Sequence, residues 1–204
     1  MMRVIPCDLL APAKGIFHRF LRQALIHQMI PQVDVVIHNF RPGTMETLNL
    51  GSDALHALNP QLVYMAISGF GTEGPLRRAP AYDPIIQAHS GMTASQGSDE
   101  APAFMRSLLC DKITAYTACQ AVTSALFARE RSGEGQLIDL SMLDASLFFM
   151  FPDGFQNDAL LDEDQVAGGL LIDMLYDLTL TKDGGITVAA ANQDMQGRML
   201  KAIG

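Results

Sequence analysis

The sequence has no tryptophan, little cysteine and no basic run, and each shortage excludes a class of protein. The three cysteines form no CxxC pair and are odd in number, so a disulfide framework is not expected and a reducing, cytoplasmic location is favoured. They are Cys7, Cys110 and Cys119. Lysine and arginine number 14 against 22 aspartates and glutamates, a net charge of −8 that argues against a nucleic-acid partner. No apolar run reaches the roughly 18 residues of a membrane span, so no membrane partner is expected.

The residues that are present have the composition of a globular protein. Apolar residues make up 49% of the chain and charged residues 18%, a balance that can bury a core. At roughly 100–200 residues per domain, the 204 residues correspond to one domain or two small ones.

An amphipathic helix is predicted near the N-terminus, from Lys14 to Ile30. Its apolar residues recur every four positions and form a predicted stripe of Phe17, Leu21, Leu25 and Met29. Two interpretations fit this acid-poor helix. We favour a helix that packs on the sheet that follows, and a mitochondrial transit peptide is the alternative.

Two apolar segments separated by a short helix predict a parallel sheet. Residues 33–40 (VDVVIHNF) form a β-branched run typical of a strand buried on both faces. Ser52 is a candidate N-cap for a helix through Leu58, and a second strand is predicted at residues 62–68. Strand, helix and strand at this spacing form a βαβ unit, so the predicted fold class is α/β.

Further elements follow along the rest of the chain. We predict a Gly- and Pro-rich loop at residues 69–84, a short helix at 85–89 and a polar linker at 95–102. A long helix is predicted at 111–131, a strand at 137–141, an apolar helix at 142–151 and an acidic linker at 153–165. The tail is predicted to form a hairpin with strands at 175–181 and 186–191, and then a helix to Gly204.

Two familiar motifs are suggested by the sequence, and neither is supported. Gly69, Gly71 and Gly74 spell GxGxxG, but Pro75 and Pro80 prevent the helix whose N-terminus would hold a pyrophosphate. A tight loop with close backbone approach is the better interpretation. No two histidines show HxxxH or HExxH spacing, so no metal site is expected; they are His18, His27, His38, His56 and His89.

Asp111 is the strongest single candidate for catalysis. It is predicted to be the N-cap of the long helix, where backbone N–H groups and the helix dipole favour an ionised carboxylate. An ordinary capping role and a nucleophile in covalent catalysis both fit this position. Cys110 is not favoured as a nucleophile, because the neighbouring acid raises a thiol pKa.

Longer segments, taken in order, resemble the class III CoA-transferase family, also called CaiB/BaiF. They are VDVVIHNFRPG at 33–43, LGSDALHALNPQLVYMAISGFG at 50–71, EGP at 73–75, AYDPIIQAHSG at 81–91, the run at 109–147 that begins LCDKITAYTACQ, and LTLTKDGGITVAAAN in the tail. The resemblance covers residues 33–204. It implies a Rossmann-like large domain with a parallel sheet at 33–152, a linker at 153–168 and the start of a smaller α+β domain at 169–204.

The resemblance implies transfer of CoA from an acyl-CoA thioester to a free carboxylate through a covalent intermediate on Asp111. Acyl-CoA and a carboxylic acid would be the substrates, with no permanently bound cofactor, and the family implies a homodimer. The implied CoA and substrate contacts are Asn39, Phe40, Arg41, Tyr82, Asp83, Gly168 and Gly169. In a racemase branch of the family a histidine stands at the position of Tyr82. Since tyrosine is a poor base near neutral pH, transfer is favoured over racemisation.

Departures from the family pattern lead us to expect a shortened member. The helical segment 1–32 does not match the family's opening strand, and Thr47 stands where many members carry an arginine. Two alternatives to a working enzyme therefore stay open: a non-catalytic family fragment, and a CoA-binding protein without turnover. No motif in the sequence specifies the acyl donor or the acceptor.

Overall fold

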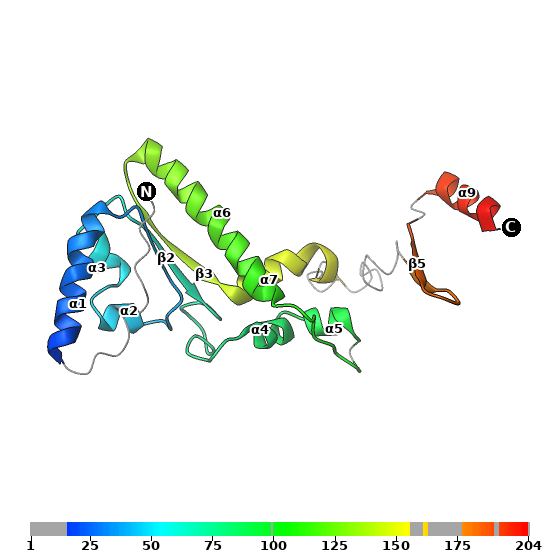
Figure 1. Cartoon of the computed structure of the whole chain (residues 1–204), viewed down its shortest axis with the longest axis horizontal. Coiled ribbons are helices and arrows are strands. Elements are labelled where there is room, and N and C mark those ends of the chain that lie inside the picture. Colours follow the sequence, from blue (N-terminus) through cyan, green and yellow to red (C-terminus); the bar gives the residue numbers. More distant parts are fainter. Residues whose placement is uncertain (1–15, 99, 156–160, 163–176, 190–191, 204) are drawn as a thin grey trace.

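The computed structural model describes residues 16–98, 100–155, 161–162, 177–189 and 192–203. A parallel three-stranded sheet in the order β1–β2–β3 forms its centre, with β1 at Val35–His38, β2 at Val63–Ser68 and β3 at Gln136–Ser141. Helices cover both faces of this sheet, with α1, α2 and α3 on one side and α6 on the other (Figure 1). The predicted α/β class and the parallel pairing of the strands are confirmed.

The helices of this body connect the strands in chain order. Before β2 come α1 (Ile16–Met29), the 3-10 helix η2 (Ile30–Gln32), α2 (Thr44–Thr47) and α3 (Ser52–His56). Between β2 and β3 come α4 (Asp83–His89), α5 (Met92–Gln96) and α6 (Leu109–Ser132). After β3 come α7 (Met142–Met150) and the π-helical turn η3 (Phe151–Phe155). Helix α5 begins before the predicted polar linker and includes its first two residues.

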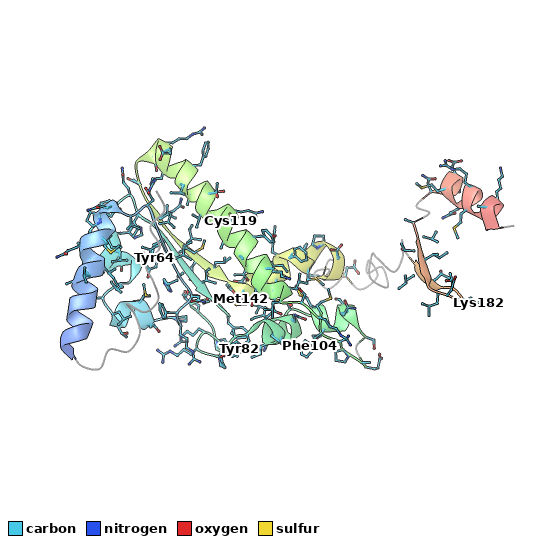
Figure 2. All side chains as sticks on the ribbon, in the orientation of Figure 1. Tyr64, Tyr82, Phe104, Cys119, Met142 and Lys182 are labelled. Atoms are coloured by element: carbon cyan, nitrogen blue, oxygen red, sulfur yellow. The ribbon has the colours of Figure 1, made fainter. Side chains whose placement is uncertain are left out.

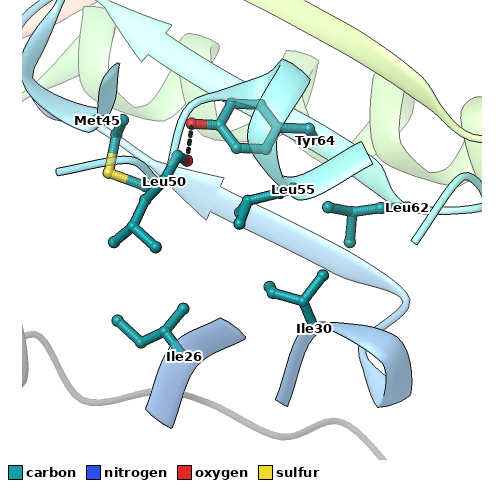
Figure 3. Close-up of a cluster of buried hydrophobic side chains, with 7 residues drawn as sticks. All are labelled: Ile26, Ile30, Met45, Leu50, Leu55, Leu62 and Tyr64. Carbon is teal, nitrogen blue, oxygen red and sulfur yellow. Dashed lines mark hydrogen bonds between the residues drawn. The ribbon is translucent and has the colours of Figure 1, made fainter. Parts of the chain in front are cut away.

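One hydrophobic cluster attaches the N-terminal helix to the sheet (Figure 3). Its buried residues come from α1, η2, α2, α3, β2 and the connecting loops, and they are Ile26, Ile30, Met45, Leu50, Leu55, Leu62 and Tyr64. Inside it, the Tyr64 hydroxyl donates to the carbonyl of Leu50 (3.0 Å). The interpretation of a helix packed on the sheet is confirmed. The predicted stripe is wrong at Leu25, which is 51% exposed, because the buried face of the helix runs through Ile26 and Ile30.

The first strand differs from its prediction. Within the described residues β1 pairs only with β2, so it is an edge strand, and Ile37 on it is 51% exposed. The β-branched run at 33–40 therefore does not form a strand buried on both faces. The central strand β2 does, because Val63, Tyr64 and Met65 are all buried. A continuous apolar run indicates a strand, but it does not give the strand's place in the sheet.

The segment that follows β2 is a loop, as its glycines and prolines predict. The next helix, α4, begins only at Asp83, so the GxGxxG sequence does not open a helix. Gly71 and Gly74 have φ of 82° each, a conformation that favours glycine. At Gly69 a Cβ atom would lie 2.0 Å from the Cβ of Ala81. These glycines serve a tight loop with close backbone approach.

A second hydrophobic cluster holds the N-terminal ends of α4, α5 and α6 together with α7. Its buried residues are Ile86, Met92, Cys110, Ile113 and Ala145. Helix α6 ends at Gly133, whose φ of 74° forms a left-handed cap with its N–H bonded to the carbonyl of Arg129 (2.8 Å). At the other end of α6, the second hydrophobic cluster packs its first turn against α4 and α7.

The tail forms a separate two-stranded antiparallel sheet of β4 (Asp177–Leu180) and β5 (Gly185–Val188), followed by α9 (Gln193–Ile203). The predicted hairpin and terminal helix are confirmed, with shorter strands. Most of the predicted acidic linker lies outside the described residues. Among the helices that are described, none is both long and apolar enough to cross a bilayer.

Candidate active site

Asp111 lies in the first turn of α6, with its side chain exposed to solvent. It is the third residue of the helix, because α6 begins at Leu109 and Leu108 occupies the N-cap position. The prediction that Asp111 itself caps the helix is therefore wrong. Leu108 has no side-chain oxygen to accept from the free N–H groups of the first turn, so an acceptor has to come from elsewhere.

Asp83 supplies that acceptor from α4. Its Oδ2 accepts from the backbone N–H of Asp111 (2.9 Å), and its Oδ1 accepts from the side-chain amide of Gln87 (2.5 Å). Asp83 is 2% exposed, and so is Gln87 one turn later on the same helix. A buried carboxylate in one helix thus caps the first turn of another. This position places Asp83 inside the protein rather than on the surface of a pocket.

The surroundings of Asp111 raise the pKa of its carboxyl group. Partial burial is the larger cause, and the negative charge of Asp83 is the second. The sequence predicts the opposite, a helix N-terminus that favours the ionised form. The difference arises because partial burial and the charge of Asp83 disfavour the ionised form more than the helix N-terminus favours it.

Cys110, beside Asp111, is buried and points into the second hydrophobic cluster. Burial is the main reason that the pKa of its thiol is raised, and the charges of Asp83 and Asp111 raise it further. Its Sγ lies 3.7 Å from the Sδ of Met92. The expectation that this thiol is unreactive therefore agrees with the structure, since the thiolate is the reactive form.

Phe40 and Arg41 lie in a different place, at the carboxyl edge of the sheet. They line a small hollow of about 60 Å³ together with residues from β1, α2, β2, the loop after β2, and β3. These include His38, Glu46, Ser68, Thr72 and Asp139. Asn39 is exposed and is not among the lining residues. Ligands of open α/β sheets bind at this edge, so the hollow is where a ligand of this fold is expected.

Sequence reasoning did not single out two groups in this hollow, His38 and the Thr72–Asp139 pair. The ring of His38 packs edge-on against Tyr64, with 5.3 Å between centroids. Burial lowers the pKa of His38, while the carboxylates of Glu46 and Asp139 act in the opposite direction. The hydroxyl of Thr72 donates to Asp139 (2.7 Å). No spacing motif could reveal these groups, because they come from three strands or loops far apart in the sequence.

The remaining predicted site residues lie outside both groups or outside the described chain. Tyr82 (Figure 2) precedes α4 and is 71% exposed. Its carbonyl accepts from the N–H groups of Ile85 and Ile86. Thr47 is exposed on α2. Gly168 and Gly169 lie outside the described residues. The structure therefore joins Asp83 to Asp111 at the start of α6, and it places Phe40 and Arg41 in the hollow at the carboxyl edge of the sheet.

Comparison with known proteins decides which family this arrangement belongs to. The sequence model of a family described as CoA-transferase family III matches residues 21–204. The chain belongs to CoA-transferase family III. The match begins twelve residues before the segment from residue 33 that carries the resemblance, and so includes part of α1.

Two named CoA-transferases and one solved crystal structure show how much of the chain is similar to known proteins. An acetyl-CoA:oxalate CoA-transferase of Acetobacter aceti is 40% identical over 133 residues, 63% of this chain and 33% of that protein. A succinyl-CoA–D-citramalate CoA-transferase of Chloroflexus aurantiacus is 34% identical over 192 residues, 89% of this chain and 46% of that protein. The crystal structure of Rv3272 from Mycobacterium tuberculosis matches with a TM-score of 0.76 and 29% identity, over 90% of this chain and 48% of that one. The chain spans at most about half the length of these relatives.

Within this family III chain, sequence reasoning also missed Gln87. Its side chain holds Asp83 and the segment before α6, through contacts that span 18 to 20 residues of sequence. The only signal available was a polar residue on the otherwise apolar face of a short helix. That pattern is common on helices and carries no specific chemistry.

Proposed function

We propose that this chain carries the nucleophile of an acyl-CoA:carboxylate CoA-transferase, and that Asp111 is that nucleophile. The observation that supports it most strongly is the position of Asp111 in the first turn of α6. Its side chain is exposed, and its backbone N–H donates to the buried carboxylate of Asp83. The names of the family and of its relatives support the reaction class. A fixed, accessible carboxylate with a raised pKa has the properties of a covalent catalyst.

The proposed reaction proceeds through two kinds of intermediate on Asp111. The carboxylate attacks the carbonyl carbon of the acyl-CoA thioester, CoA leaves as the thiolate, and a mixed anhydride forms. The thiolate then attacks the Asp111 carbonyl and expels the donor acid, which leaves an aspartyl-CoA thioester. The acceptor carboxylate attacks the carbonyl of that thioester, expels the CoA thiolate and forms a second mixed anhydride with Asp111. The thiolate then attacks the acceptor's acyl carbon in this anhydride, and the new acyl-CoA forms. The last step regenerates the Asp111 carboxylate.

CoA is proposed to bind along the carboxyl edge of the sheet, where Phe40 and Arg41 line the hollow. The exposed guanidinium of Arg41 suits a phosphate, and Phe40 offers an apolar surface beside it. Asn39 and Tyr82 are proposed as further contacts because the resemblance implies them and both are exposed. Gly168 and Gly169 stay a prediction of the resemblance. CoA enters this scheme as a substrate, and no permanently bound cofactor is proposed.

A second candidate is a family member that binds CoA or folds without turnover. The observation in its favour is the open edge of β1, which has no strand partner beyond β2 among the described residues. Racemisation is not favoured, because Tyr82 stands where that branch needs a base. We also propose a homodimer, and a cytoplasmic location in keeping with the free thiols of Cys110 and Cys119.

Intact-mass spectrometry after incubation with a panel of acyl-CoAs tests the proposed nucleophile. We expect a covalent CoA or acyl adduct that hydroxylamine removes and that Asp111→Ala and Asp111→Asn abolish. Asp53→Asn, an exposed aspartate in the first turn of α3, is the matched control and should label like the wild type. A folded wild-type chain that gives no adduct with any donor would contradict the proposal. CoA titration by calorimetry would then separate a binder from an inert chain.

A further inference from the structure

Beneath Asp111 lies a buried polar network that the proposed reaction does not itself require. It consists of the carboxylate of Asp83 and the amide of Gln87, both 2% exposed, on the helix whose Ile86 belongs to the second hydrophobic cluster. A buried anion is expensive unless its oxygens accept hydrogen bonds. Both Asp83 oxygens do so, from the Gln87 amide (2.5 Å) and from the Asp111 N–H (2.9 Å).

Gln87 connects this pair to the segment that leads into α6. Its Nε2 donates to the carbonyl of Ser107 (3.1 Å), and its Oε1 accepts from the N–H of Met105 (2.9 Å). The amide therefore holds the chain just before α6 while Asp83 holds its first turn. Lys112 adds a bond on the outer side, from its Nζ to the hydroxyl of Ser107 (2.7 Å).

We propose that Gln87, acting through Asp83, is a positioning residue that fixes the backbone of Asp111 for nucleophilic attack. The inference rests on the proposed function of Asp111 and deepens it. It also gives Asp83 a different role from the substrate contact implied by the resemblance. Because both oxygens of Asp83 are bonded to protein groups and its side chain is buried, it is not available to a substrate.

The arrangement explains why a glutamine suits this place better than an apolar residue. A side chain of similar size without the amide would leave a buried carboxylate with one donor fewer and the backbone N–H of Met105 without its acceptor. The first turn of α6 would then move relative to α4. A displacement of about 1 Å at a reacting group can cost about a hundredfold in rate.

The test compares Gln87→Leu and Asp83→Asn on α4 with Gln120→Leu, which replaces an exposed glutamine further along α6. The rate constant of hydroxylamine-labile adduct formation is measured over a range of acyl-CoA concentrations by intact mass. We expect the limiting rate constant of Gln87→Leu and of Asp83→Asn to be at least tenfold lower than that of the wild type. Their half-saturating acyl-CoA concentrations should stay within about twofold of the wild-type value, and Gln120→Leu should behave as the wild type does. An unchanged limiting rate constant in folded variants, or a change confined to half-saturation, would overturn the proposal.

A second measurement does not depend on turnover and covers the case of a failed reaction. The amide resonance of Asp111 is followed by ¹H–¹⁵N NMR, and the titration of its carboxyl carbon by ¹³C NMR; Asp83 on α4 and Cys110 on α6 are the titratable groups beside it. Asp83→Asn, which keeps the size of the side chain, should move the amide upfield and lower the carboxyl titration midpoint. If the wild type forms no adduct, the proposed function fails. If the amide and the midpoint are unmoved by Asp83→Asn, the positioning role fails.

Discussion

The charge of Asp111 lies where the folded chain makes that charge unfavourable. Its pKa is raised by partial burial and by Asp83, so the folded state holds the proton more tightly than the unfolded chain does. The ionised side chain therefore costs stability above the folded pKa, and this cost disappears below the ordinary aspartate value of about 3.9. We predict that Asp111→Asn stabilises the chain at pH 7, by about 0.2–1 kcal/mol because the side chain is exposed.

Urea unfolding of the wild type and of Asp111→Asn at a series of pH values checks this prediction. The gain should be full at pH 7 and should shrink as the pH falls toward 4. A gain of the same size at every pH would show that packing, not charge, is responsible. Asp111→Asn should also fail to form the adduct. Higher stability together with lost activity is the result expected when a residue serves function at a cost in stability.

Single residues differ in how far the sequence reveals them. Asp111 could be found because a carboxylate at the start of a long helix has a recognisable position and because the surrounding segment resembles the family. Its raised pKa could not be predicted, since the causes are partial burial, which depends on the fold, and then the charge of Asp83, 28 residues away in sequence. Gln87 could not be found either, because its role depends on burial and on backbone groups that only the fold brings together.

At the scale of elements, the approach of β3 to β2 depends on a glycine. A Cβ atom at Gly135 would lie 2.0 Å from the carbonyl oxygen of Leu62, while at Gly133 it would meet nothing within 4 Å. We predict that Gly135→Ala destabilises the chain by about 1–3 kcal/mol through forced separation of the strands. Gly133→Ala should cost only about 1 kcal/mol, through its left-handed conformation.

Thermal unfolding of the two alanine variants beside the wild type measures the difference. Both introduce the same side chain within three residues of each other, so they differ in the space around the new methyl group and in backbone conformation. Equal losses in the two variants would contradict the close approach of Gly135 to β2. A larger loss at Gly133 would show that backbone strain outweighs the steric contact.

The elements themselves were largely predictable, and the failures have identifiable physical causes. Strands, helices and the parallel βαβ order follow from local apolar patterns and from glycine and proline positions. The prediction that β1 is buried on both faces was wrong because an edge strand and a central strand can carry the same β-branched run. The predicted buried face of α1 was wrong because two stripes of apolar residues, one residue apart, fit the helical spacing almost equally well. Only packing selects the stripe through Ile26 and Ile30.

At the scale of the whole molecule, large apolar side chains remain exposed in one stretch of the described chain. Phe148 and Phe149 on α7 and Phe151 in η3 are 84%, 53% and 51% exposed. Aromatic side chains are enriched at protein–protein interfaces relative to the rest of the surface. This stretch supports the proposed homodimer, because association of two copies would remove these rings from water.

Phe148→Ser tests the homodimer through this stretch. Phe148 contributes little to the core of one chain, so the variant should keep the thermal stability of the monomer while its dimer dissociation constant rises at least tenfold, about 1.4 kcal/mol. Sedimentation velocity over a hundredfold concentration range measures the constant. Phe127→Ser, which removes an equally large exposed ring from α6, is the control and should dimerise as the wild type does. Equal dimerisation by both variants would place the contact on another surface, and a monomeric wild type would exclude the homodimer.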